Sequence, residues 1–160
     1  MRHTSLVSIY ISLLIALVCQ LFPWVGQGII LRPDFMLVVT LYWLLRAPNL
    51  CNVGTAWLAG LLVDLATGSL LGQHALSFCF TAYVAMSYQR RLVLFNKGQL
   101  LAYVFILLLI ERILILLLKL FAGNENPGWV YFLPIFTGLL LWQLMILIFG
   151  DLTRPKTKNG

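Results

Sequence analysis

Long apolar runs separated by short polar breaks dominate this sequence. A helix needs about 20 residues to cross the hydrocarbon core of a bilayer, within a range of roughly 17–25. The runs therefore predict six transmembrane helices, at about 5–22, 29–46, 53–67, 74–89, 99–121 and 129–149. With 61% hydrophobic and 10% charged residues, the chain carries more apolar surface than a small soluble domain can bury. We expect an all-α, polytopic membrane protein with one integral membrane domain over 1–160.

The second run is interrupted near its start by Arg32-Pro33-Asp34, which leaves a short apolar part from Phe35 to Leu45. Proline presets the backbone of a first helical turn, and an aspartate suits the positive N-terminal end of a helix. The triplet therefore predicts a helix start. As a structural device it needs no ligand, and it is also a candidate contact for a periplasmic partner.

The basic residues are distributed unevenly between the two sides that six spans define. One side holds both chain ends and eight of the eleven Lys and Arg residues, namely Arg2, Arg46, Arg90, Arg91, Lys97, Arg154, Lys156 and Lys158. The other side keeps Arg32 and Lys119, and Arg112 lies inside a span. An excess of Lys and Arg marks cytoplasmic loops, so we expect both termini in the cytoplasm. The net charge of +6 does not indicate nucleic-acid binding, because the basic residues do not cluster with stacking aromatics.

Large aromatic residues lie near the predicted span ends. Such residues often occupy the membrane–water interface. We therefore expect an interfacial position for Trp24, Trp43, Trp57, Tyr88, Trp129 and Tyr131.

Three charged residues fall within the predicted spans: Asp64, Glu111 and Arg112. Each costs about 2.5–3.5 kcal/mol at the centre of a membrane helix, so each should face the bundle interior and find a partner. Glu111 and Arg112 are adjacent, which directs their side chains about 100° apart, and we expect each to need its own partner. A pair between Asp64 and Arg112 across helices is one arrangement that the sequence permits. Structural pairing is favoured over catalysis.

Asp64 belongs to a stripe of small residues. Ala56, Gly60 and Asp64 recur every four residues, which places them on one face of a helix. Small residues at this spacing let membrane helices approach closely. Gly68 is expected at the end of this helix and Gly72 in the connection that follows. The favoured interpretation is a packing face with one satisfied carboxylate; a proton or solute site and a subunit contact remain alternatives.

Catalytic and metal-binding motifs are not recognisable in the sequence. The histidines, His3 and His74, have no metal-binding companion at helical spacing, and no serine–histidine or phosphate-loop motif occurs. We therefore expect no catalytic, cofactor-binding or metal-binding residues, and no enzymatic activity.

One segment, densest over about 31–83, resembles a known family. It begins with Arg32-Pro33-Asp34-Phe35 and continues through a pattern of glycines, an aspartate and a small–leucine pair at Gly60, Asp64, Gly68, Gly72 and Ala75-Leu76. This ordered combination is similar to the MreD family. The later half resembles that family in hydropathy alone, and Glu111-Arg112 has no counterpart in the pattern.

The resemblance implies a non-enzymatic scaffold subunit in the bacterial inner membrane, needed for rod shape and lateral peptidoglycan synthesis. The implied partners are MreC (a single-span protein with a periplasmic domain), the MreB filament, directly or through MreC, and the membrane glycosyltransferase–transpeptidase pair of the elongation complex. It also implies a fold similar to the solute-binding subunits of energy-coupling-factor vitamin transporters. A solute-binding subunit of such a transporter is therefore the alternative function.

Overall fold

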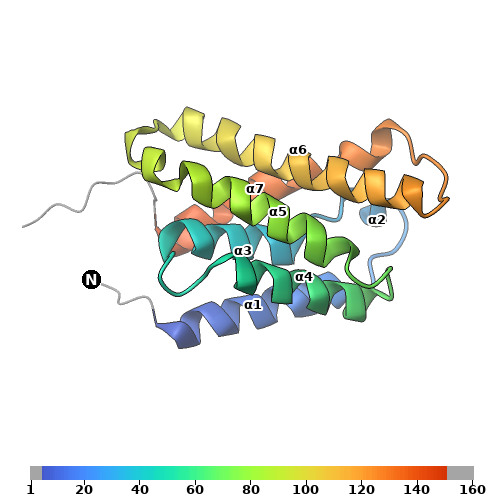
Figure 1. Cartoon of the computed structure of the whole chain (residues 1–160), viewed down its shortest axis with the longest axis horizontal. Helices are drawn as coiled ribbons and strands as arrows, with labels where there is room; N and C mark the ends of the chain where they lie inside the picture. Colours follow the sequence, from blue (N-terminus) through green and yellow to red (C-terminus); the bar gives the residue numbers. More distant parts are fainter. Residues whose placement is uncertain (1–4, 151–160) are drawn as a thin grey trace, which may run out of the picture.

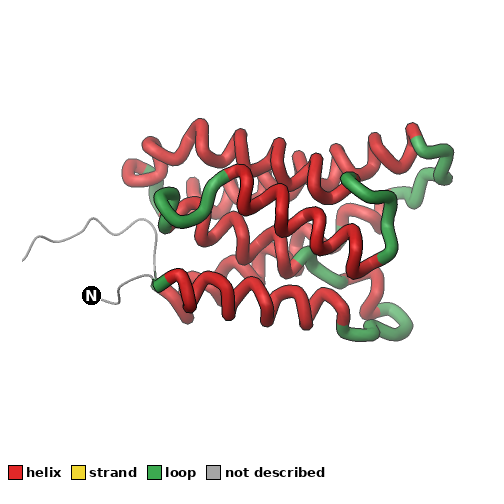
Figure 2. Tube along the Cα trace, turned by 60° about the horizontal axis from the view of Figure 1, so that its bottom comes forward, coloured by secondary structure: helices red, strands yellow, loops and turns green. Residues whose placement is uncertain are grey.

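The computed structural model describes residues 5–150, and this part of the chain consists of helices joined by loops, without strands (Figures 1 and 2). One short 3-10 helix, Gln89–Leu94, follows the fifth α-helix, and a second, Trp129–Phe132, precedes the seventh. The α-helices are α1 (Leu6–Leu21), α2 (Gly28–Leu31), α3 (Phe35–Arg46), α4 (Val53–Thr67), α5 (Gln73–Tyr88), α6 (Lys97–Phe121) and α7 (Pro134–Phe149). The expected all-α class is confirmed.

The six longer helices lie side by side, and the chain runs back and forth between two ends of the bundle (Figure 1). The start of α1 and the end of α7 lie at one end, together with connections 47–52 and 89–96; we call this the terminal end. Connections 22–34, 68–72 and 122–133 lie at the other, which we call the distal end. The polar breaks of the sequence therefore gather at two surfaces, and the apolar runs lie between them.

Helix α3 forms the centre of the bundle. Every residue from 36 to 45 is buried, and α3 packs against α1, α4, α5 and α7. Trp43 is only 2% exposed, and its indole Nε1 donates a hydrogen bond of 2.7 Å to the hydroxyl of Ser12 on α1. The central location of α3 therefore buries the ring inside the bundle, and the interfacial depth expected for Trp43 stays a prediction. Trp129, by contrast, is 91% exposed.

The outer helices present apolar side chains to their surroundings, including Leu14 on α1, Phe80 on α5 and Leu147 on α7. Three segments are long and apolar enough to cross a membrane: Gly28–Arg46, Lys97–Phe121 and Trp129–Phe149. Leu6–Leu21 and Val53–Thr67 are shorter apolar helices. The apolar exterior identifies lipid as the solvent of this fold, and six crossings remain a prediction.

The second apolar run is broken into α2 and α3, as its polar triplet predicts. Arg32 ends α2 in an extended conformation, and Asp34 immediately precedes α3. The Asp34 carboxylate makes no capping hydrogen bond to the first turn of α3. The Asp34 side chain instead contacts residues of α1 and α6.

Candidate functional site

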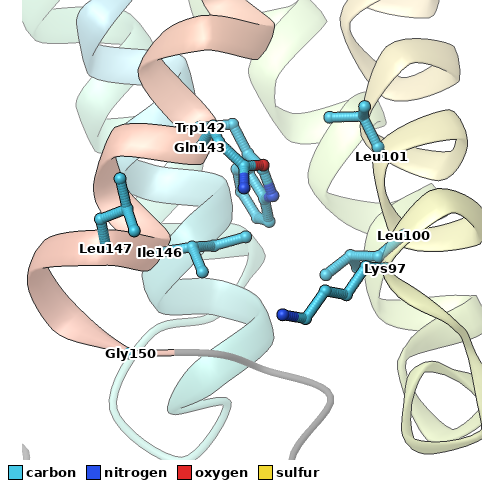
Figure 3. Close-up of a pocket in the computed structure, with 8 residues that line it drawn as sticks. All are labelled: Lys97, Leu100, Leu101, Trp142, Gln143, Ile146, Leu147 and Gly150. Carbon is cyan, nitrogen blue, oxygen red and sulfur yellow. The ribbon is translucent and has the colours of Figure 1, made fainter.

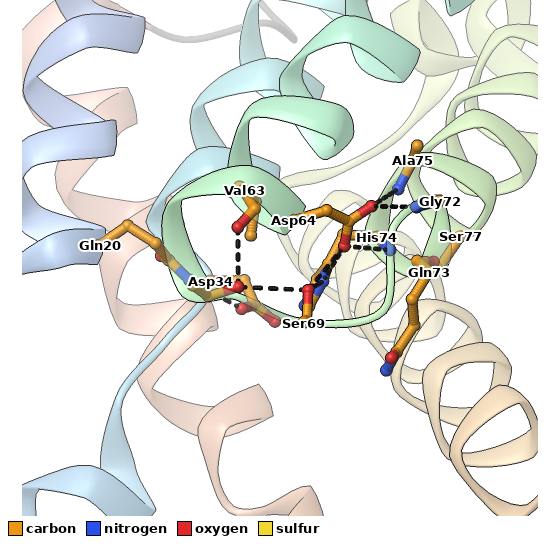
Figure 4. Close-up of polar contacts among 11 residues, drawn as sticks. Gln20, Asp34, Val63, Asp64, Ser69, Gly72, Gln73, His74, Ala75 and Ser77 are labelled. Atoms are coloured by element: carbon orange, nitrogen blue, oxygen red, sulfur yellow. Dashed lines mark hydrogen bonds and ion pairs between the residues drawn. The ribbon is translucent and has the colours of Figure 1, made fainter. Parts of the chain in front are cut away.

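The Asp64 carboxylate lies near the distal end of α4 and is 1% exposed. Backbone amides of Gly72, His74 and Ala75 donate to it, with N···O distances of 2.9, 3.0 and 3.3 Å (Figure 4). The Ser69 hydroxyl donates over 2.9 Å, and His74 Nδ1 lies 2.8 Å from the same carboxylate. Both oxygens are therefore fully engaged by the α4–α5 connection and the first turn of α5.

Two glycines allow the chain to close around Asp64. Gly68 ends α4 with a φ of 65°, and Gly72 precedes α5 with a φ of 94°. Both values lie in the left-handed region that favours glycine. The reversal points the free amides of the α5 N-terminus at the carboxylate, an arrangement that stabilises negative charge. The expected positions of Gly68 at a helix end and Gly72 in the connection are confirmed.

Helices α4 and α5 approach each other closely at Gly60. A Cβ atom placed on it would lie 2.5 Å from the Cα atom of Ala75 and 2.6 Å from the carbonyl oxygen of His74. Ala56, one turn earlier, is also buried. The small-residue stripe thus lies against the backbone of α5, and this close approach brings the α5 amides within reach of Asp64.

A second polar cluster joins α1, α3 and α6. Arg112 Nη2 lies 2.6 Å from Asp34 Oδ2, and Arg112 Nε lies 3.7 Å from Glu111 Oε2. Gln20 Nε2 donates to Asp34 over 3.4 Å, while Gln20 Oε1 accepts from the Phe35 amide over 3.1 Å. The Asp64–Arg112 pair that the sequence permits does not form, because the Arg112 guanidinium pairs with Asp34 instead.

The expectation of separate partners is confirmed for Arg112, which has Asp34, but is wrong for Glu111, whose ion-pair partner is its neighbour Arg112. Their Cα–Cβ bonds diverge, but the long arginine side chain folds back far enough to reach its neighbour. Glu111 is 1% exposed, and its Oε1 has no hydrogen-bond partner within residues 5–150. Arg112 and Lys119 also lie over the ring of Tyr131, at 5.3 and 5.2 Å from its centroid.

Ser69, His74 and Asp64 lie close together but are not arranged as a catalytic triad of nucleophile, base and acid. In such a triad, the nucleophile and the acid bind opposite nitrogens of the imidazole. Here the Ser69 hydroxyl lies 3.4 Å from His74 Nδ1, the same nitrogen that Asp64 contacts. The geometry therefore suits fixing a loop rather than activating the serine hydroxyl.

Metal chemistry has no recognisable centre in the part of the chain that the structure describes. Over residues 5–150, no group of three or more His, Cys, Asp or Glu side chains is placed to hold a metal ion. Asp64 and His74 form a pair without a third ligand of this kind.

Several members of the two clusters were not identified from the sequence: Ser69, His74, Gln20 and Tyr131. His74 follows the glycine pattern directly, but a single histidine carries no spacing signal. Its contact with Asp64 depends on how the 68–72 connection turns. Gln20 lies at the end of an otherwise apolar run, and a polar residue buried there is the one signal that could have indicated a partner.

The helices, their apolar exterior and their buried charge clusters define a helical membrane protein. Comparison with known proteins gives the family. The family model described as rod shape-determining protein MreD matches residues 1–152. Rod shape-determining protein MreD of Haemophilus influenzae is 34% identical over 143 residues, which cover 88% of this chain and 86% of that protein. This chain belongs to the MreD family of rod shape-determining proteins. No solved structure gave a significant match.

Proposed function

We propose that this chain is a non-enzymatic scaffold subunit of the bacterial elongation complex in the inner membrane. The match of the MreD family model to residues 1–152 carries this proposal. The partners proposed are MreC, the MreB filament, directly or through MreC, and the glycosyltransferase–transpeptidase pair that builds lateral-wall peptidoglycan. In this role the protein holds partners together in the membrane and carries out no bond chemistry of its own.

The geometry of Asp64 supports a scaffold role. Its carboxylate accepts hydrogen bonds from three backbone amides and the Ser69 hydroxyl and also contacts His74, so its lone pairs fix the α4–α5 connection. A group used in this way has little capacity left to bind a solute or move a proton. The alternative of a vitamin-binding transport subunit has no comparable support, since the family match is to a shape-determining protein.

The orientation proposed places the terminal end in the cytoplasm and the distal end in the periplasm. Arg46, Arg90, Arg91 and Lys97 all lie at the terminal end of the described structure, as the positive-inside rule requires for a cytoplasmic surface. The Arg32-Pro33-Asp34 break then faces the periplasm. This is the side on which the periplasmic domain of MreC would be available for contact.

The proposal is tested by deleting the gene and by co-expressing the chain with MreC. We expect the deletion strain to lose its rod shape and the two proteins to purify together. A strain that stays rod-shaped, combined with no co-purification, would contradict the scaffold role. Stabilisation of the purified chain against heat by one member of a vitamin panel would favour the transport alternative instead.

Asp64 supplies a more local test. Asp64→Leu leaves the amides of Gly72, His74 and Ala75 without their acceptor, and each buried donor left unsatisfied costs about 1–3 kcal/mol. We expect less folded protein in the membrane, less co-purified MreC and rounded cells. Glu125→Gln, in the exposed 122–128 connection, is the matched control and should leave all three unchanged. Normal assembly and normal shape with Asp64→Leu would refute the structural role of this carboxylate.

A further inference from the structure

A cavity of about 460 Å³ opens at the distal end, between the two polar clusters. It is bounded by the end of α1, the α2–α3 break, the α4–α5 connection, α6 and the segment before α7. Arg32, Arg112 and Lys119 line it from separate parts of the chain, together with Asp34. These are all the basic residues of the distal half, so its positive charge converges on one cavity.

Among the described residues, Arg112 is the one of these three cations that forms ion pairs with acidic side chains. Arg112 is taken by Asp34 at 2.6 Å and by Glu111, which lies buried beside it. Within residues 5–150, neither Arg32 nor Lys119 makes an ion pair. Lys119 lies over the face of the Tyr131 ring and interacts with Glu111 electrostatically from beyond ion-pair distance. Glu125 lies in the neighbouring 122–128 connection and makes no ion pair there.

Arg32 shows most directly that an acceptor is lacking. Its Nε is buried, and no hydrogen-bond acceptor lies within reach in the described structure. A buried donor without an acceptor costs about 1–3 kcal/mol, and more when the group is charged. An anion in the cavity would supply the missing acceptor and remove this cost.

The surroundings of the three cations suggest which anion fits. Ile29 and Ile30 on α2 and Val130 before α7 also line the cavity, and all three are exposed. Arginine and lysine donors suit phosphate oxygens, while exposed aliphatic side chains suit acyl chains. We propose that this cavity binds the phosphate group of an anionic phospholipid headgroup, with its chains lying along the apolar flank.

The test uses the full chain purified in detergent, titrated with dihexanoyl phosphatidylglycerol, with dihexanoyl phosphatidylcholine and with inorganic phosphate, and followed by calorimetry. We expect saturable binding that is tightest for phosphatidylglycerol. Arg32→Gln combined with Lys119→Gln should weaken that binding about a hundredfold, since each lost charge-assisted contact accounts for about tenfold. The matched control, Arg90→Gln combined with Arg91→Gln at the terminal end, should change it less than about twofold.

Three results would overturn the proposal. The first is no saturable binding of either phosphatidylglycerol or inorganic phosphate. The second is equal weakening by both double variants, which would mean attraction to net charge alone. The third is binding of inorganic phosphate as tight as that of phosphatidylglycerol, which would assign the cavity to a free anion. Lys119→Gln alone, which removes no ion pair, keeps the test valid if the double variant unfolds, and should weaken binding about tenfold.

Discussion

The two ends of the bundle hold their positive charges in different ways. At the distal end, Arg112 is fixed between two acidic side chains, and all four carboxylates of residues 5–150 (Asp34, Asp64, Glu111 and Glu125) lie in this half. At the terminal end, Arg90 and Arg91 make no ion pair with a described residue. Arg90 and Arg91 are exposed, and Arg91 lies 6.0 Å from the centre of the Tyr88 ring.

Arg46, at the terminal end, is held by hydrogen bonds to two other residues of the chain. Its Nη1 donates to the hydroxyl of Tyr42 and, over 3.2 Å, to the carbonyl oxygen of Gly150. Tyr42 donates to the same carbonyl over 2.9 Å, which ties the end of α3 to the end of α7. A cavity of about 310 Å³ opens between α6 and α7 at this end, lined by Trp142, Gln143 and Lys97 among others (Figure 3).

The comparison shows that the cations at the two ends are held by different kinds of contact. Arg112 and Lys119 lie beside acids and an aromatic ring, so their positions depend on individual partners. At the terminal end, Arg46 binds a carbonyl and a hydroxyl, while Arg90 and Arg91 are exposed and should be replaceable at little cost in folding free energy. We expect the number of cations at the terminal end to set the orientation of the protein in the membrane, whereas the paired distal charges contribute to its packing.

Arg112→Leu should have the largest effect on stability. The substitution leaves Asp34 and Glu111 buried without their cation, and removing one partner of a buried pair costs about 3–5 kcal/mol. Unfolding in mild detergent by added sodium dodecyl sulfate, followed by tryptophan fluorescence, measures the change. Arg91→Leu at the terminal end is the control. Equal stability of the two variants would remove the distinction between the ends.

Gly60→Ala should have an intermediate effect. The added methyl group meets the backbone of Ala75 at 2.5 Å, and backbone atoms cannot move aside without separating α4 from α5. Overpacking of this kind costs about 1–3 kcal/mol. Gly98→Ala, in the first turn of α6 at the terminal end, has open space around it and should be neutral or slightly stabilising. The same titration compares the two, and a neutral Gly60→Ala would disprove the close approach.

Arg90→Gln combined with Arg91→Gln should have the smallest effect. Both side chains are exposed and neither makes an ion pair with a described residue, so the free energy of unfolding should change by less than about 0.5 kcal/mol. Thermal unfolding in detergent is a sufficient measurement. A loss of more than about 1 kcal/mol would reveal a specific partner at the terminal end and weaken the comparison.

The apolar runs were sufficient to locate the six longer helices, since a polar break is unmistakable between them. The expected run at 53–67 coincides with α4, and the run at 99–121 begins two residues late because α6 starts at Lys97. The last run proved less regular. Its helix begins at Pro134, a residue suited to a first turn, and a 3-10 helix precedes it.

The partners of the charged residues were much harder to predict than the helices. To predict the Asp34–Arg112 ion pair, one must know how α3 and α6 are rotated about their axes. Helices that are apolar on most sides give little indication of this rotation. The contacts of Asp64 depend on a five-residue connection whose turns are set by Gly68 and Gly72. The small-residue stripe was recognisable, but the amides that it brings to the carboxylate were not.

The central position of α3 also relaxes a length requirement. Its 12 residues extend about 18 Å, well short of the roughly 30 Å of a bilayer core. A lipid-exposed helix of that length would force the bilayer to thin, but α3 is enclosed by its neighbours. The open backbone at Arg32–Asp34 can therefore lie below the headgroups, because irregular chain is tolerated at that depth where protein surrounds it. We therefore expect Arg32, Pro33 and Asp34 to form a short polar segment at membrane depth.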